Sequence, residues 1–230
     1  MNIDVIIPNY NHSIYLIDSI KSCVLQGIST KNIYVVDDNS SDNPEKILEK
    51  FSINFIKNEK NLGPAASRNI GIKNSKSKYI AFLDSDDIML PDRLKNSISI
   101  LDSGAKMVCG NYKFLINRKF ITNNFYKNPI NIEYYNLFKT NLVACGSVSL
   151  NRSVLDDVGL FNEDYRLAED YDLWLRISEK YKIEYIHKPL YLYSRINNSS
   201  LTSNPNNLNT LISNIEKIKE LSKKKNQKLI

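Results

Sequence analysis

The stretch YIAFLDSDD, residues 79–87, decides the fold of this chain of 230 residues. Its apolar part, residues 80–83, shows no alternation of polar and apolar side chains, which predicts a strand buried on both faces of a parallel sheet. Asp84, Asp86 and Asp87 follow at the carboxyl end of that strand. Because open α/β sheets bind ligands at that edge, the acidic residues are candidates for a binding site.

The acidic residues allow two interpretations. Carboxylates packed this closely repel one another unless they share a cation. Mg²⁺ and Mn²⁺ take oxygen ligands and usually complete their coordination with waters and substrate phosphates, so one interpretation is a site for a metal and a diphosphate. The other is a solvated acidic turn that caps the next helix, because Asp is common at helix starts. The stretch alone leaves both open.

Strands and helices alternate before and up to this stretch. Short apolar runs predict strands at residues 3–8, 32–36, 53–56 and 80–83. Apolar residues at helical spacing predict helices between them, at residues 13–25, 47–51 and 63–75. This order predicts an α/β fold, with a parallel sheet and helices on both of its faces. The polar loops that follow the strands then converge on one edge of the sheet.

The second half of the chain predicts a mixed continuation of the sheet. Strands are expected at residues 106–109, 183–186 and 190–193, and a hairpin or meander at 112–125. Helices are expected at residues 93–101, 132–138, 152–158 and 168–181. The chain length fits one large α/β domain, which we place at residues 1–204, followed by a tail at 205–230.

Composition restricts the class of protein. The hydrophobic fraction of 42% and the charged fraction of 24% are ordinary for a soluble globular protein. Cys23, Cys109 and Cys145 lie far apart without metal-binding spacing, which argues against a disulfide framework or a zinc site. The chain has no apolar run of membrane-spanning length, and its first residues do not resemble a signal peptide. We therefore expect a cytoplasmic protein.

Positive charge is concentrated in the tail. Residues 205–230 hold six lysines and two glutamates, which accounts for most of the net charge of +6 and argues against a broad nucleic-acid-binding face. Apolar residues recur there at helical spacing and predict an amphipathic helix: Leu208, Leu211, Ile212, Ile215, Ile218 and Leu221. Such a helix either lies on an anionic membrane surface or packs its apolar stripe on the domain, and the sequence leaves both open.

Five motifs together resemble a known family. They are VIIPNYN at 5–11, VVDDNSSD at 35–42, NLGPAASRNIGI at 61–72, FLDSDD at 82–87 and AEDYDLWLR at 168–176. In this order they resemble the inverting family 2 glycosyltransferases with the GT-A fold, of the bacterial surface-glycan type. The resemblance implies an α/β fold with a mixed, mostly parallel central sheet flanked by helices. It also implies a nucleotide-binding part at about residues 1–110 and an acceptor-side part at about 111–204.

The resemblance implies a set of residues that bind the sugar donor: Pro8, Tyr10, Asp38, Arg68, Asp84 and Ser85. A carboxylate only accepts hydrogen bonds, so Asp38 suits the N–H of a uracil-type base. The planar, charged guanidinium of Arg68 suits phosphate. Considered alone, Asp38 could equally form a local turn or helix cap, and Arg68 could form an ion pair on a helix surface.

The resemblance also implies the metal and the catalytic base. Asp86 is the expected main ligand of Mn²⁺ or Mg²⁺, and Asp87 a second carboxylate for it. Asp170 is the expected base, with Glu169 beside it, because an inverting transfer needs one carboxylate to take the proton of the acceptor hydroxyl. The metal would neutralise the leaving diphosphate. Without the resemblance, Glu169 and Asp170 could simply stabilise the start of a helix through its dipole.

Three positions depart from the pattern or have no expected role. Many relatives carry a histidine shortly before the segment that matches Ser200–Thr202, where this chain has Asn197. His187 is an unsuitable replacement because it falls in an expected strand, and the role of His12 is open.

The expected function is metal-assisted, inverting transfer of a sugar from a nucleotide-diphosphate sugar, with a UDP-sugar favoured, to a hydroxyl of a glycan or lipid-linked glycan. The alternative is a non-catalytic nucleotide-sugar-binding or scaffold domain of the same fold. A nucleotidyltransferase would normally carry a Gly-rich phosphate loop after the first strand, where this chain has PNYNHS. Peripheral contact with the inner face of an anionic membrane is possible, and no nucleic-acid partner is expected.

Overall fold

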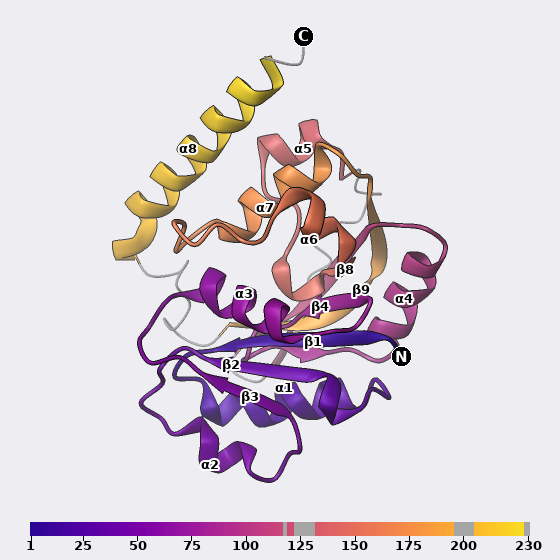
Figure 1. Cartoon of the computed structure of the whole chain (residues 1–230), viewed down its shortest axis with the longest axis vertical. Coiled ribbons are helices and arrows are strands. Elements are labelled where there is room, and N and C mark those ends of the chain that lie inside the picture. The colour runs from indigo at the N-terminus through magenta and orange to yellow at the C-terminus, as the bar shows by residue number, and fades with distance from the viewer. Residues whose placement is uncertain (117–118, 122–131, 196–204, 228–230) are drawn as a thin grey trace.

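The computed structural model describes residues 1–116, 119–121, 132–195 and 205–227 (Figure 1). The strands of these described residues form one nine-stranded sheet in the order β3-β2-β1-β4-β8-β6-β9-β5, with β7 paired to β6. Helices cover both faces of the sheet, with α1 and α2 on one side of β1 and α3 on the other (Figure 1). The predicted α/β fold with a mixed, mostly parallel sheet is confirmed.

The first half of the chain is the parallel part of the sheet. Strands β1 (Ile3–Asn9), β2 (Ile33–Asp37), β3 (Asn54–Lys57) and β4 (Tyr79–Phe82) pair in parallel. Helices α1 (Ser13–Val24), α2 (Pro44–Leu48) and α3 (Pro64–Asn74) connect them, with the 3₁₀ turn η1 (Thr30–Asn32) before β2. This alternation is the one that the apolar runs predict.

Strand β1 is buried on both faces, as expected for a central parallel strand. Val5 and Ile7 belong to one hydrophobic cluster and Ile6 to the other, on the opposite side of the sheet. Helix α3 approaches β1 closely, because a Cβ atom at Gly71 would come within 2.5 Å of the Ile6 side chain. A glycine at this position therefore lets α3 lie directly on the sheet.

The second half adds antiparallel strands. β8 (Ser149–Asn151) pairs antiparallel with β4 and β6 (Met107–Ile116), and β7 (Lys119–Ile121) pairs antiparallel with β6. β9 (Ile183–Arg195) pairs parallel with β6, and β5 (Ile88–Met89) pairs antiparallel with β9. The sheet is thus mixed beyond β4, as predicted.

Three details differ from the sequence-based prediction. The strands expected at 183–186 and 190–193 are one strand, β9, whose register against β6 shifts around Asn111 and Pro189. The strand expected at 106–109 continues to Ile116 and forms a hairpin with β7, while the rest of the segment 112–125 lies outside the described residues. The short strands β5 and β8 were not expected, because strands of two and three residues have no periodicity.

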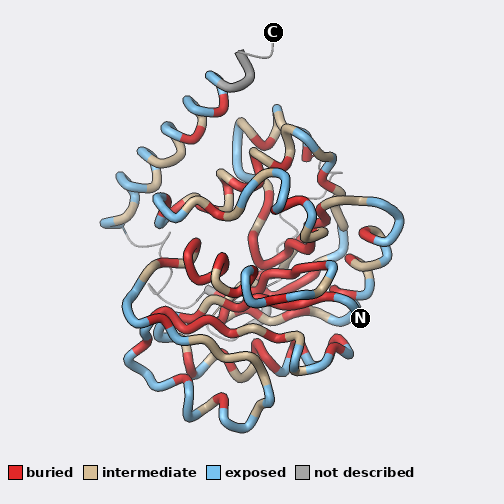
Figure 2. The backbone as a smooth tube through the Cα atoms, viewed as in Figure 1, coloured by how far each residue is buried: buried red, intermediate tan, exposed pale blue. Residues whose placement is uncertain are grey.

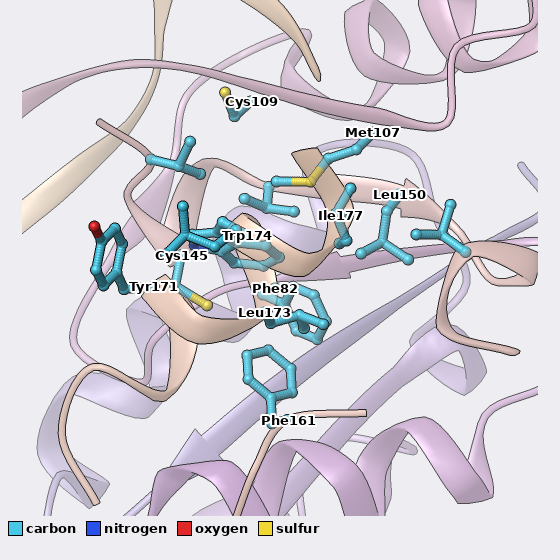
Figure 3. Close-up of a cluster of buried hydrophobic side chains, with 14 of the residues drawn as sticks. Phe82, Met107, Cys109, Cys145, Leu150, Phe161, Tyr171, Leu173, Trp174 and Ile177 are labelled. Atoms are coloured by element: carbon cyan, nitrogen blue, oxygen red, sulfur yellow. The ribbon is translucent and has the colours of Figure 1, made fainter. Parts of the chain in front are cut away.

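The second half also carries the remaining helices. They are α4 (Arg93–Asp102), α5 (Tyr134–Lys139), α6 (Ser153–Val158), α7 (Glu169–Ser178) and α8 (Leu208–Gln227), with 3₁₀ turns η2 (Cys145–Ser147) and η3 (Pro205–Asn207). Trp174 of α7 is fully buried, and its ring lies 5.9 Å from that of Phe161 and 6.4 Å from that of Phe82 (Figure 3). This packing fixes α7, and therefore its N-terminal residues, against the end of β4.

Helix α8 lies along the edge of the molecule, with its inner side buried and its outer side exposed (Figure 2). Ile218 is only 3% exposed, and Ile215 packs beside it against the hydrophobic cluster that contains Trp174. Leu208 and Leu221, by contrast, are 54% and 53% exposed. Part of the predicted apolar stripe is therefore buried against the protein. Among the described residues, no helix is long and apolar enough to cross a membrane.

Candidate active site

A cavity of about 950 Å³ opens at the carboxyl ends of the parallel strands. Among the described residues that line it are all of the predicted site residues except Asp87: Pro8, Tyr10, Asp38, Arg68, Asp84, Ser85, Asp86, Glu169 and Asp170. A second hollow of about 530 Å³ lies near Ile100, Lys106 and Lys182, and none of the predicted site residues lines it. We therefore take the larger cavity as the candidate active site.

Asp38 forms one end of the cavity, where β2 ends. Its Oδ1 accepts hydrogen bonds from Asn58 Nδ2 at 2.9 Å and from the Leu62 backbone N–H at 2.8 Å, and its Oδ2 accepts one from the Gly63 N–H at 2.7 Å. The carboxylate thus holds the loop that precedes α3. Helix α2 begins at Pro44, and its N-cap position, Asn43, has no side-chain cap hydrogen bond, so Asp38 does not cap that helix.

Arg68 lines the cavity from helix α3. It is 5% exposed, and its guanidinium donates from Nη1 to Glu169 Oε1 at 2.7 Å and from Nη2 to Asp84 Oδ1 at 2.8 Å. The predicted alternative, an ion pair on a helix surface, is therefore wrong. Arg68 instead links the end of β4 to the start of α7, and it places one positive charge between two carboxylates.

Asp86 faces the cavity on the other side of Asp84. Burial, together with the negative charge of Asp84, raises the pKa of Asp86 to about 6, and His12 opposes the rise. His12 also lines the cavity, where its Nδ1 lies 3.3 Å from Ser85 Oγ. His12 is thus a cavity residue to which the sequence assigned no role.

Asp87 lies behind the cavity wall and is 1% exposed. Its Oδ1 accepts a hydrogen bond from the Ser194 backbone N–H at 2.8 Å, and Ser194 Oγ donates to the carbonyl oxygen of Asp86. Among the described residues, none donates a hydrogen bond to Asp87 Oδ2. Burial, together with the charges of Asp86 and Asp84, raises the pKa of Asp87 well above its usual range. The side chain of Asp87 is therefore hydrogen-bonded to β9, and Asp87 is absent from the cavity lining among the described residues.

Glu169 and Asp170 begin helix α7. The preceding residue, Ala168, has a left-handed backbone with φ of 64°, which turns the chain sharply into the helix. Burial, together with the negative charge of Glu169, raises the pKa of Asp170 to about 7, while Arg68 opposes the rise. Asp170 Oδ1 accepts a hydrogen bond from the Tyr171 N–H at 2.7 Å. A carboxyl group with a pKa near neutrality suits the role of a general base.

The residues fit a divalent metal bound together with a diphosphate. The described residues contain no group of three or more His, Cys, Asp or Glu side chains arranged to hold a metal ion. Asp84 and Asp86 nevertheless place two carboxylates on the cavity wall, and the raised pKa of Asp86 reflects burial and a repulsion that a cation would relieve. Mg²⁺ is commonly held by one or two carboxylates with substrate phosphates and waters completing its coordination.

Several cavity residues could not be found from the sequence. The cavity is also lined by Tyr112 and Phe114 of β6 and by Tyr191 and Tyr193 of β9, as well as by Asn207 of η3 and Thr210 of α8. Only the pairing of β6 with β9, far apart in the chain, brings the aromatic residues together. Asn197 and Ser200–Thr202 lie outside the described residues, and His187 lies on β9 beside Tyr185.

Comparisons with known proteins agree on one family. The family model described as glycosyl transferase family 2 matches residues 4–159. The Escherichia coli protein WfgD, described as UDP-Glc:alpha-D-GlcNAc-diphosphoundecaprenol beta-1,3-glucosyltransferase, is 35% identical over 208 residues, which cover 88% of this chain and 80% of WfgD.

Two solved structures share the fold. The structure of S. aureus TarS 1-349 in complex with UDP-GlcNAc matches with a TM-score of 0.74 at 22% identity, over 88% of this chain and 61% of that one. The mannosyltransferase PcManGT from Pyrobaculum calidifontis, in complex with GDP-Man and Mn²⁺, matches with a TM-score of 0.68 at 15% identity, over 87% of this chain and 59% of that one. This chain therefore spans about three fifths of each of those chains.

Proposed function

The chain belongs to glycosyl transferase family 2 and is a glycosyltransferase with the GT-A fold, and we propose that it transfers a sugar from a UDP-sugar to a hydroxyl of a glycan with inversion. The observation that carries the proposal is the position of Asp170. This carboxyl group, with a pKa raised to about 7, lies in the same cavity as the charged residues that suit a diphosphate.

The uridine would bind at the Asp38 end of the cavity, beside Pro8 and Tyr10. A carboxylate offers about four acceptor positions, and the protein's own N–H groups use three of them at Asp38. The remaining position suits the single imide N–H of uracil. WfgD is described as using UDP-Glc, and TarS binds UDP-GlcNAc, which supports a UDP-sugar as donor.

The diphosphate would lie over Asp84, Ser85 and Asp86, with Arg68 beneath it. Asp86, with Asp84 beside it, would hold Mn²⁺ or Mg²⁺, which when bound neutralises the negative charge of the leaving diphosphate. PcManGT was solved with Mn²⁺, which supports this cofactor. The role proposed for Asp87 is different: through Ser194 it anchors the acidic loop to β9.

The reaction needs one base. Asp170 would accept the proton of the acceptor hydroxyl while that oxygen forms a bond to the anomeric carbon and the bond from this carbon to the diphosphate breaks. Glu169 is held by Arg68, so it positions the start of α7 and leaves Asp170 to take the proton. The half-buried position of Asp170 keeps its carboxylate poorly solvated and therefore basic.

The proposed acceptor is a lipid-linked glycan of bacterial surface-polysaccharide synthesis. WfgD is described as acting on a sugar diphosphoundecaprenol, and the related TuaG of Bacillus subtilis as a putative teichuronic acid biosynthesis glycosyltransferase. Such an acceptor would bring the enzyme to the inner face of the cytoplasmic membrane. Because Ile215 and Ile218 are turned toward the protein, the membrane contact we propose is electrostatic, through the lysines of α8.

The experiment is a screen of nucleotide sugars with Mn²⁺ or Mg²⁺, in which release of the nucleoside diphosphate is measured with and without alkyl glycoside acceptors. We expect release from at least one UDP-sugar with the full chain, and loss of this release in the variant Asp170→Asn. If no UDP-sugar is turned over although UDP binds, the chain is a nucleotide-sugar-binding domain without catalysis, and the proposal is wrong.

A further inference from the structure

Strands β6 and β9 carry aromatic residues at matching, alternate positions. In their parallel pairing, Tyr112 lies opposite Tyr191, and Phe114 lies opposite Tyr193. Because successive side chains of a strand point to opposite faces of the sheet, these rings all lie on one face. That face is a wall of the cavity, since all of these residues line it. We call these residues the aromatic wall.

The rings of the aromatic wall contact one another. Ring centroids are 5.5 Å apart for Tyr112 and Tyr191, 5.7 Å for Tyr112 and Tyr193, and 5.7 Å for Phe114 and Tyr193. Tyr191 and Phe114 are almost fully buried, whereas Tyr112 and Tyr193 are half-buried. The two buried rings therefore support the other two, which present part of their surface to the cavity.

The aromatic wall lies on the far side of the acidic loop from the proposed uridine site. In the sheet, β1 and β2 lie on one side of β4, and β6 and β9 lie on the other. Tyr193 directly precedes Ser194, whose backbone N–H donates to Asp87 and whose hydroxyl donates to the Asp86 carbonyl. A donor with its base at Asp38 and its diphosphate at Asp86 therefore places its sugar toward the aromatic wall, and an acceptor would enter beyond that sugar.

The chemistry of the wall suits a sugar ring. A pyranose has an apolar face of C–H groups that can lie flat on an aromatic ring, and tyrosine combines an apolar ring with a hydroxyl that can bond to a sugar hydroxyl. The cavity of about 950 Å³ is at the upper end of the range for small-molecule sites, so it has room for a donor and one further sugar. Apolar surface that stays accessible on a folded protein often marks a ligand-binding groove, and the half-buried rings of Tyr112 and Tyr193 present such surface to the cavity.

We infer that the aromatic wall is the acceptor subsite, in which Tyr112 stacks on the sugar ring of the acceptor that carries the attacking hydroxyl. The inference rests on the proposed function and deepens it, because it names the residues that select a pyranose as acceptor. Tyr112 is the residue to test, since Tyr193 adjoins the contacts that anchor the acidic loop.

The test compares Tyr112→Ala and Tyr112→Phe with a matched control, Lys113→Ala. Lys113 is the next residue of β6, and its side chain points to the opposite face of the sheet. With UDP-glucose as donor and octyl N-acetylglucosaminide as acceptor, we expect the acceptor KM of Tyr112→Ala to rise about tenfold, which corresponds to ~1.4 kcal/mol. The donor KM, the Kd of UDP and the release of UDP without acceptor stay near wild type. Tyr112→Phe keeps the ring and should stay within about threefold of the wild-type acceptor KM.

The other outcomes overturn the inference. A rise in donor KM with unchanged acceptor KM would assign the wall to the donor sugar. A fall in melting temperature with equal loss of every activity would make Tyr112 a packing residue only. Two results would overturn the subsite while the proposed function stands. One is release of UDP by the wild-type enzyme without transfer to octyl N-acetylglucosaminide, and the other is an unchanged acceptor KM in Tyr112→Ala. Absence of UDP release from the wild-type enzyme would instead contradict the proposed function itself.

Discussion

Arg68 and Glu169 are 101 residues apart in the sequence, yet Arg68 Nη1 lies 2.7 Å from Glu169 Oε1. The same guanidinium binds Asp84 through Nη2, and the Arg68 side chain is only 6% exposed. One buried cation therefore joins three parts of the cavity: helix α3, the acidic loop after β4 and the start of α7. Because a buried charge is costly without its partner, this contact fixes the distance between the donor side and the base side of the cavity.

Replacing Arg68 should destabilise the fold as well as the site. Arg68→Met leaves Glu169 and Asp84 without their cation, and breaking a buried pair in this way costs about 3–5 kcal/mol. The free energy of unfolding, measured by urea denaturation, should fall by this amount. The double variant Arg68→Met/Glu169→Gln removes one uncompensated charge and should recover part of the loss.

The control is an exposed pair, Lys57 and Glu45, whose side chains are 43% and 55% exposed. Lys57→Met should change the free energy of unfolding by about 1 kcal/mol or less, because surface ion pairs contribute little. Similar losses in Arg68→Met and Lys57→Met would show that the Arg68 contact is no stronger than a surface pair.

Asp170→Asn should preserve the fold and donor binding but lower the turnover number by about 10²–10⁴-fold, the usual contribution of a general base. The amide has nearly the same shape but cannot take the proton. Asp172→Asn is the matched control, because Asp172 lies on the same helix, pairs with Arg176 and is absent from the cavity lining among the described residues. Near-normal turnover in a folded Asp170→Asn variant would move the base elsewhere, first to Glu169.

The pH dependence follows from the raised pKa of Asp170. Burial raises the pKa from its ordinary 3.8 to about 7, and only the ionised form can act as the base. The value of kcat/KM should therefore fall with a slope of about one as the pH drops below about 7, and Asp170→Asn should lose this acidic limb. A flat profile of the wild-type enzyme from about pH 5 to 8 would argue against Asp170 as the base.

The raised pKa of Asp170 also predicts an effect on stability: activity should rise with pH, whereas the contribution of Asp170 to the free energy of unfolding should fall. Between the ordinary and the raised pKa, the folded state binds more protons at Asp170 than the unfolded state does, so this residue's contribution to stability falls as the pH rises. The variant Asp170→Asn, which cannot ionise, should therefore gain stability relative to wild type at about pH 8 and lose that advantage toward about pH 4. Urea denaturation at the two pH values measures the difference.

Asp86 and Asp87 should behave differently although they are neighbours. Asp86→Ala should abolish the strengthening of UDP binding by Mn²⁺, because Asp86 lies on the cavity wall. Asp87→Asn should keep that strengthening, because the amide oxygen can still accept the hydrogen bond from the Ser194 N–H. Titration of UDP with and without Mn²⁺ decides between the two roles. If Asp87→Asn also loses the metal effect, Asp87 is a metal ligand, as the family resemblance implied.

The parallel half of the fold was predictable because its signals are local. The buried run before Asp84 and the apolar spacing of α1 each depend on neighbouring residues, and the structure has these elements close to the expected positions. The place of the acidic loop at a sheet edge followed from the topology of parallel strands. The resemblance of the five motifs to one family then indicated which cavity residues to expect.

The remainder depends on contacts between distant parts of the chain. Asp84, Asp86 and Asp87 look alike in the sequence, and only the contact of Asp87 with Ser194, 107 residues away, separates it from the other two. The aromatic wall likewise depends on the register between β6 and β9. Pro189 interrupts the apolar pattern of β9, so the sequence predicted two strands where the structure has one. A single sequence carries no local signal for either contact.

The last prediction concerns helix α8 and the membrane. Burial of Ile215 and Ile218 removes the middle of the apolar stripe, so we expect the lysines of the helix to supply most of its attraction to an anionic surface, on the order of 1 kcal/mol each. We therefore expect weaker binding to anionic vesicles at low salt when four lysines of the helix are changed to glutamine. They are Lys217, Lys219, Lys223 and Lys224. The control variant carries the same change at four exposed lysines of the nucleotide-binding half, and it should retain vesicle binding. These lysines are Lys46, Lys50, Lys60 and Lys73. Co-sedimentation with anionic and with zwitterionic vesicles measures the difference.

Equal loss of vesicle binding in the two lysine variants would mean that net charge alone drives binding. Absence of binding by the wild-type chain would exclude α8 as a membrane contact.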